Sequence, residues 1–180
     1  MEAPFRHRAV HEPLLAAEQL GDERLRQLYA LWLARGPAPD PSFIDPVALR
    51  FILGSIIVFA VVGGGERTSL RFRYRLCGTQ VVDRMGMDLT GRHVDEHPVP
   101  ESRILIGRLL ESVVRERAPY LVRADRRKYS RIWRTESAVL PLFDPAGEIT
   151  TILAGQIVPP DVPAFLKPDA EPPPKSPRRL

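Results

Sequence analysis

The sequence of 180 residues contains a single cysteine, Cys77, so this chain can form no internal disulfide. One free thiol is usual in a reducing compartment. The longest apolar run, residues 51–62, is interrupted by Gly54 and Ser55 and is too short to span a bilayer. The first residues are charged and lack the apolar core of a signal peptide. These absences predict a soluble, cytoplasmic protein that does not enter a membrane.

The motifs of the common catalytic sites are also missing. The sequence has no G-x-S-x-G, no P-loop and no cysteine–histidine zinc spacing. His93-Val94-Asp95-Glu96-His97 fits the H-x-x-E-H pattern of one zinc-protease class, but Gly91 and Pro98 flank it and disfavour the continuous helix which that site needs. We interpret this segment as a solvated loop. The sequence therefore predicts no enzymatic activity and no metal site.

Charge and composition are those of an ordinary globular protein. Hydrophobic residues make up 44% and charged residues 27% of the chain, and the net charge is +4 with both signs mixed along the sequence. Mild basicity of this kind does not predict nucleic-acid binding.

The most informative pattern is a pair of strands near the middle of the chain. Residues 56–62 are a β-branched apolar run that ends at three glycines, which predict a hairpin turn. The following strand alternates strictly, and a period of two indicates a sheet with one buried face. The apolar set is expected to face the core and the polar set to face outward: Leu70, Phe72, Tyr74 and Leu76 against Arg71, Arg73, Arg75 and Cys77.

The remaining segments predict helices on either side of three more strands. Asp22 caps a helix over Asp22–Arg35, whose apolar stripe is Leu25, Leu28, Tyr29 and Trp32. Further helices are predicted at Val47–Leu53, Thr79–Met85 and Glu101–Arg117, and further strands at Pro119–Arg126, Arg131–Phe143 and Ile149–Val158. The result is an α+β domain with a five-stranded antiparallel sheet over residues 22–158. Residues 1–21 are predicted to be a flexible N-terminal segment, and residues 159–180 a disordered proline-rich tail.

This order of elements resembles a PAS domain with an N-terminal amphipathic helix, as in the short single-PAS proteins common in alphaproteobacteria. Several short motifs carry the resemblance by their order and spacing: Tyr29 and Trp32, Ile44-Asp45-Pro46, Arg75-Leu76-x-Gly78-Thr79, Leu89-Thr90-Gly91-Arg92, and Pro141-Leu142 before a D-x-x-G turn. Cys77 does not lie in the N-C-R-F-L-Q motif of the similar LOV photoreceptors, so flavin photochemistry is not expected.

The resemblance implies a sensory or signalling module without an output domain, which acts through ligand-modulated or constitutive protein–protein interaction. It implies a homodimer, an unknown signalling partner and a small-molecule ligand. No cofactor is expected; the alternative is a heme with His93 or His97 as its axial ligand. The alternative is a ligand-free scaffold or adaptor that binds a partner through the basic sheet face. Candidate pocket residues are Phe72, Tyr74, Leu76, Thr79 and Trp133, and candidate interaction residues are Leu25, Tyr29, Trp32, Arg71, Arg73 and Arg75.

Overall fold

One antiparallel sheet of six strands forms the centre of the protein. The structure is a computed structural model that describes residues 6–63, 70–128 and 131–159. The strands lie in the order β1-β4-β5-β6-β2-β3, which leaves β1 and β3 at the two edges. Their bounds are Arg6–Pro13 (β1), Ile56–Val62 (β2), Arg71–Cys77 (β3), Tyr120–Lys128 (β4), Arg131–Phe143 (β5) and Ile149–Ile157 (β6).

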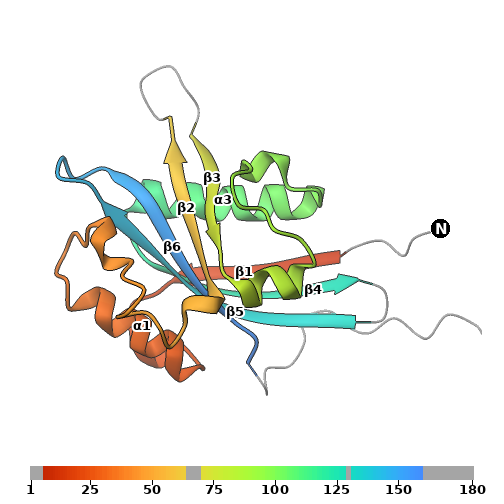
Figure 1. Cartoon of the computed structure of the whole chain (residues 1–180), viewed down its shortest axis with the longest axis horizontal. Helices are drawn as coiled ribbons and strands as arrows, with labels where there is room; N and C mark the ends of the chain where they lie inside the picture. Colours follow the sequence, from red (N-terminus) through yellow and green to blue (C-terminus); the bar gives the residue numbers. More distant parts are fainter. Residues whose placement is uncertain (1–5, 64–69, 129–130, 160–180) are drawn as a thin grey trace, which may run out of the picture.

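Helices cover both faces of this sheet (Figure 1). Helix α1 (Glu23–Leu33) packs on one face together with residues 41–55, while α2 (Thr79–Met85) and α3 (Pro100–Glu116) cover the other. Consecutive residues of β2 alternate between the two cores, as the pleat of a strand requires. The α+β fold with an antiparallel sheet is therefore confirmed, and α2 has the predicted bounds, with the left-handed Gly86 as its C-cap. The short 3-10 turns are Ala17–Gln19, Pro41–Phe43, Leu53–Ser55 and Val94–Glu96.

The sixth strand, β1, lies in the segment that the sequence predicts to be flexible. All eight of its residues pair with β4, from Arg6 opposite Arg127 to Pro13 opposite Tyr120. The prediction of a flexible segment is thus wrong for residues 6–13, and the sheet has six strands instead of five. The sequence of β1 is mostly polar and has no local apolar pattern from which a strand could be predicted. Backbone pairing with β4 holds it in the sheet. Residues 1–5 and the tail 160–180 lie outside the described residues.

A bulge in the β2–β3 pair changes the facing of Leu76. The register shifts between Val58, which pairs with Leu76, and Phe59, which pairs with Tyr74. One extra residue in a strand reverses the faces of the residues beyond it. Leu76 is consequently 39% exposed, and the half-buried Cys77 packs against the core in its place. The prediction that Leu76 faces inward and Cys77 outward is wrong for this reason.

The apolar stripe of α1 is buried on the sheet of its own chain. The side chains of Leu25, Leu28, Tyr29 and Trp32 are between 0% and 7% exposed. Tyr29 Oη donates a hydrogen bond of 3.1 Å to the Leu14 carbonyl, and Trp32 Nε1 donates one of 3.0 Å to the Pro141 carbonyl. The helix predicted at Val47–Leu53 is not formed; turns lead there into the 3-10 turn Leu53–Ser55.

Candidate ligand-binding site in the core

Two adjoining cavities lie between the sheet and the helices α2 and α3. Each has a volume of about 60 Å³. About 10–15 Å³ suffices for one water molecule, so together they offer space for a small organic molecule. The two cavities share five wall residues: Met85, His97, Arg126, Thr135 and Gln156.

The first cavity has an apolar wall and a polar end. The apolar wall comes from β2, α3 and β5, with Ile57, Phe59, Leu105, Leu109, Leu110 and Val139 among its residues. The polar end is assembled from five parts of the chain: His7 of β1, Tyr74 of β3, His97 after the 3-10 turn, Arg126 of β4 and Gln156 of β6. Such a division suits a ligand with one polar and one apolar end.

Several polar atoms in this region are buried without a hydrogen-bond partner. They include Tyr74 Oη, His97 Nε2, Arg126 Nε and His7 Nε2, and also Arg84 Nε in the wall of the second cavity. A buried polar atom without a partner costs about 1–3 kcal/mol, and native proteins contain few of them. The atoms of this cluster surround the two cavities and can each form a hydrogen bond with a ligand or an ordered water there.

The hydrogen bond at one nitrogen of His97 determines what the other nitrogen offers. The Val99 amide donates to His97 Nδ1 at 3.0 Å, so Nδ1 carries the lone pair. Burial, with the positive charge of Arg126 as the next cause, lowers the pKa of His97 to about 4, and the ring is neutral at pH 7. A neutral ring with an accepting Nδ1 carries its proton on Nε2. His97 Nε2 is thus an unused hydrogen-bond donor.

His7 and Tyr74 are neutral in the same environment. Burial, followed by the charges of Arg126 and His97, lowers the pKa of His7 to about 3. His7 Nδ1 lies 3.1 Å from Ser102 Oγ of α3, which ties the edge strand to that helix. Burial raises the pKa of the Tyr74 hydroxyl, so this group keeps its proton and remains a donor.

The charge of Arg126 is not matched by an acid in the cavity walls. Among the described residues, the walls of both cavities contain Arg84 and Arg126 but no Asp or Glu. Burial lowers the pKa of Arg126, which shows that its environment disfavours the positive charge. Desolvation of a cation without a nearby anion is unfavourable, and a bound anion would relieve it.

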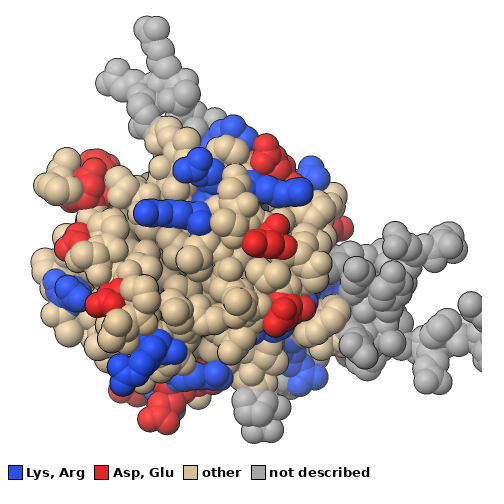
Figure 2. All heavy atoms as spheres, viewed as in Figure 1, with Lys and Arg blue, Asp and Glu red and all other residues tan. Residues whose placement is uncertain are grey.

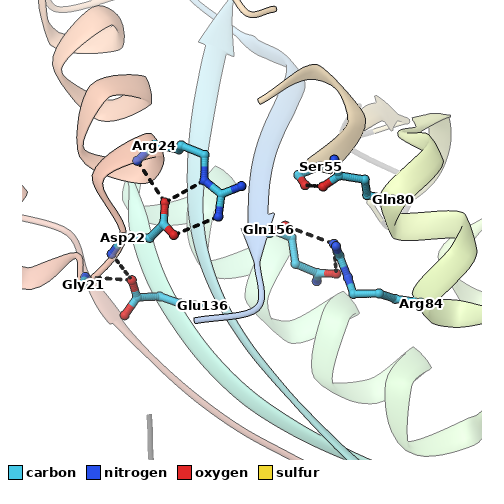
Figure 3. A network of polar contacts seen from close by, with 8 residues as sticks. All are labelled: Gly21, Asp22, Arg24, Ser55, Gln80, Arg84, Glu136 and Gln156. Carbon is cyan, nitrogen blue, oxygen red and sulfur yellow. Dashed lines mark hydrogen bonds and ion pairs between the residues drawn. The ribbon is translucent and has the colours of Figure 1, made fainter. Parts of the chain in front are cut away.

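Separate polar contacts lie beside the second cavity and on the opposite face of the sheet (Figure 3). Arg84 NH2 donates to the Gln156 carbonyl at 3.0 Å and lies 3.5 Å from Gln156 Oε1. Nearby, the Ser55 hydroxyl donates to Gln80 Oε1 at 2.5 Å and so ties α2 to the start of β2. Across the sheet, Glu136 Oε1 accepts the amide of Gly21 at 2.8 Å, immediately before α1.

The structure brings together only part of the predicted pocket set. Tyr74 lines the first cavity and Trp133 the second. Phe72 is buried in the same core but does not line these two cavities, and neither do the exposed Thr79 and Leu76. Binding of a ligand by Tyr74 and Trp133 stays a prediction.

A heme does not fit these residues. Cavities of about 60 Å³ are far smaller than a porphyrin requires, and His97 presents an N–H instead of a lone pair to them. His93 lines neither cavity; its backbone forms an isolated bridge with Arg73. Among the described residues, no group of three or more His, Cys, Asp and Glu side chains is placed to hold a metal ion.

The predicted interaction residues fall into two groups. The α1 residues Leu25, Tyr29 and Trp32 are buried and hold the helix on the sheet, so a homodimer would need another surface. Arg71, Arg73 and Arg75 are exposed on the edge strand β3, where Arg71 pairs with Asp95 at 2.8 Å. On the face that Figure 2 displays, basic and acidic side chains are interspersed. Within the described ranges, no helix is long and apolar enough to cross a membrane.

Sequence reasoning missed several polar wall residues, among them His7, Arg84, Arg126 and Gln156. The position of Arg126 could have been recognised from the sequence. Alternate residues of β4 face the core: Tyr120, Val122, Ala124 and Arg126. An arginine in such an inward-facing series is unusual. His7 had no such signal, since its strand was not predicted.

The comparison with protein families decides the identity of this fold. The model described as "PAS domain" matches residues 21–157. The chain belongs to the PAS domain family. No protein with a curated description matches it.

Solved structures similar to this PAS domain include other PAS and LOV proteins. The PAS domain of BvgS from Bordetella pertussis is 23% identical with a TM-score of 0.49, and the alignment covers 62% of this chain and 83% of that one. An RNA-binding light-oxygen-voltage receptor is 13% identical with a TM-score of 0.46, over 85% of this chain and 39% of the receptor. A sensory box histidine kinase/response regulator from Burkholderia thailandensis is 16% identical with a TM-score of 0.36, over 63% and 83%.

Proposed function

We propose that this PAS domain is a cytoplasmic sensory module in which a small molecule in the two core cavities alters the docking of α1 and thereby the binding of a signalling partner. The observation that carries the proposal is the set of buried polar atoms without partners around the cavities. In this proposal the domain transmits a binding event and catalyses no reaction. A ligand acts only through its different affinity for two packings of the domain.

Strand β5 supplies a route from the cavities to α1. Thr135 and Ser137 line the first cavity, and Glu136 between them points to the opposite face, since side chains alternate along a strand. Glu136 accepts the amides of Gly21 and Asp22, at 2.8 and 3.3 Å, where α1 begins. A ligand that shifts β5 would therefore act on the start of α1.

The proposal is tested by native and denaturing mass spectrometry of the freshly purified chain. We expect an extra mass in the native spectrum that is lost on denaturation. Ala124 lines the first cavity and is 5% exposed, so Ala124→Leu should fill the space and remove the extra mass. Ala30→Leu, which makes the same change on the exposed side of α1, is the matched control and should retain it.

A chain that carries no extra mass, and that no small molecule stabilises against heat, would contradict the ligand-dependent proposal. That outcome would favour the ligand-free scaffold, which binds its partner through the exposed arginines of β3. The same native spectra report whether the chain forms the homodimer that we also propose.

A further inference from the structure

Four of the buried polar atoms around the cavities are hydrogen-bond donors that have no partner among the described residues. Arg126 Nε and Arg84 Nε carry hydrogens at any physiological pH, and His97 Nε2 carries one because Nδ1 accepts from Val99. The Tyr74 hydroxyl also retains its proton. A ligand that satisfies these atoms must therefore offer acceptors, and several of them.

The charge balance selects among acceptor-rich ligands. The walls hold two guanidinium groups, Arg84 and Arg126, and no Asp or Glu lines either cavity among the described residues. A neutral acceptor would satisfy the hydrogen bonds but leave the half-buried positive charges unmatched, whereas an anion would satisfy the hydrogen bonds and match the charge. A planar carboxylate matches the guanidinium fork in geometry as well as in charge.

The apolar wall of the first cavity disfavours a ligand that is polar throughout. Leu105, Leu109 and Leu110 of α3 face Ile57 and Phe59 of β2 across the first cavity. An inorganic anion would leave this surface uncovered, while a hydrocarbon chain would gain its burial. The volume of about 60 Å³ for each cavity restricts that chain to a few carbons.

We propose that the ligand is a short-chain aliphatic carboxylate, whose head is bound by Arg126, His97 and Tyr74 and whose hydrocarbon part lies against α3. This inference rests on the proposed ligand-binding function and adds the chemical class of the ligand.

Calorimetric titration of the full chain, dialysed into carboxylate-free buffer, tests the inference with acetate, propionate, butyrate and hexanoate. We expect saturable binding that tightens about fourfold for each added CH₂ until the cavity is filled. Butyramide, which has the same shape without the charge, should bind at least about tenfold more weakly. Inorganic phosphate should not bind in the cavity.

Two variants locate the binding site. Arg126→Gln should weaken butyrate binding at least about tenfold, while Arg73→Gln, the same substitution at an exposed position of β3, should leave it unchanged. If Arg126→Gln fails to fold, Tyr74→Phe removes only one donor and should weaken butyrate binding about three- to tenfold.

Equal affinities for butyrate and butyramide, preference for phosphate, or no saturable binding of any carboxylate would overturn the inference. A neutral molecule found in the native mass spectrum would also overturn it but would leave the sensory function standing. Hydrogen exchange of α1 measures its docking. If a carboxylate binds and this exchange does not change, the ligand class is retained but the signalling route through α1 is contradicted.

Discussion

Glu136 is almost completely buried, yet it is held by donors from three directions. Its carboxylate accepts the amides of Gly21 and Asp22 and the Nε–H of Arg123 at 3.1 Å. Arg123 in turn donates to the Gln19 carbonyl at 2.7 Å. A buried carboxylate is stable only with such partners. This one residue therefore joins β4, β5 and the segment that leads into α1.

At this scale we predict that Glu136→Gln lowers the free energy of unfolding by about 1–3 kcal/mol, because the amide keeps one acceptor but loses the charge that binds Arg123. Urea denaturation monitored by circular dichroism measures the change. Glu148→Gln at an exposed position is the control and should change stability by less than about 0.5 kcal/mol. Equal losses in both variants would show that the carboxylate of Glu136 has no special role.

Between elements, α1 packs closely on β6 at Gly155. A Cβ on Gly155 would lie 2.5 Å from Leu28 Cδ2 and 3.1 Å from Leu25 Cδ2. The first distance is shorter than real Cβ contacts and the second is tighter than most, so an alanine at this position would force the buried side chains of Leu28 and Leu25 to move. The small residue in β6 thus determines how far the helix sinks onto the sheet.

We expect Gly155→Ala to destabilise the protein by about 1–3 kcal/mol through overpacking under α1. Gly107→Ala in α3 is a matched control, since a Cβ there meets no atom within 4 Å. Alanine also favours the helix by about 0.5–1 kcal/mol, so this control should be neutral or stabilising. Thermal unfolding distinguishes the two; a stabilised Gly155→Ala would mean that α1 is not seated as described.

For the molecule as a whole, the buried histidines connect stability to pH. Burial first, and then the charge of Arg126, lowers the pKa of His7 to about 3 and that of His97 to about 4, from 6.5. Arg103 also acts on His97. Below pH 6.5 these histidines become protonated in the unfolded chain but stay neutral in the folded chain. The free energy of unfolding therefore falls as the pH decreases from 6.5 toward the folded-state pKa values.

We therefore predict a lower urea midpoint at pH 5 than at pH 7. The hydrogen bond with Arg24 lowers the pKa of Asp22 from 3.8. Carboxylates of this kind therefore affect the stability mainly at more acidic pH. The double variant His7→Asn, His97→Gln should lose less stability over this interval than the wild type. Identical losses in the two proteins would contradict the assignment to these histidines.

Much of the fold follows from local patterns that the sequence displays directly. Strand β2 and helix α2 have the predicted bounds, and the ends of β5 agree as well, because alternation, β-branched residues and Gly86 act over a few neighbouring residues. The stripe of α1 was recognised too, although its residues bind the sheet of their own chain.

The site itself depended on contacts between distant segments. Strand β1 exists because β4 offers it backbone partners more than a hundred residues away, and with it His7 reaches the cavity. The bulge opposite Val58 turned Leu76 outward, which no count of alternating residues reveals. The sequence by itself determined β2, α2, β5 and the apolar stripe of α1, because these depend on local periodicity. Only the tertiary structure decided which polar side chains meet in the core, because that depends on strand order, register and close approach.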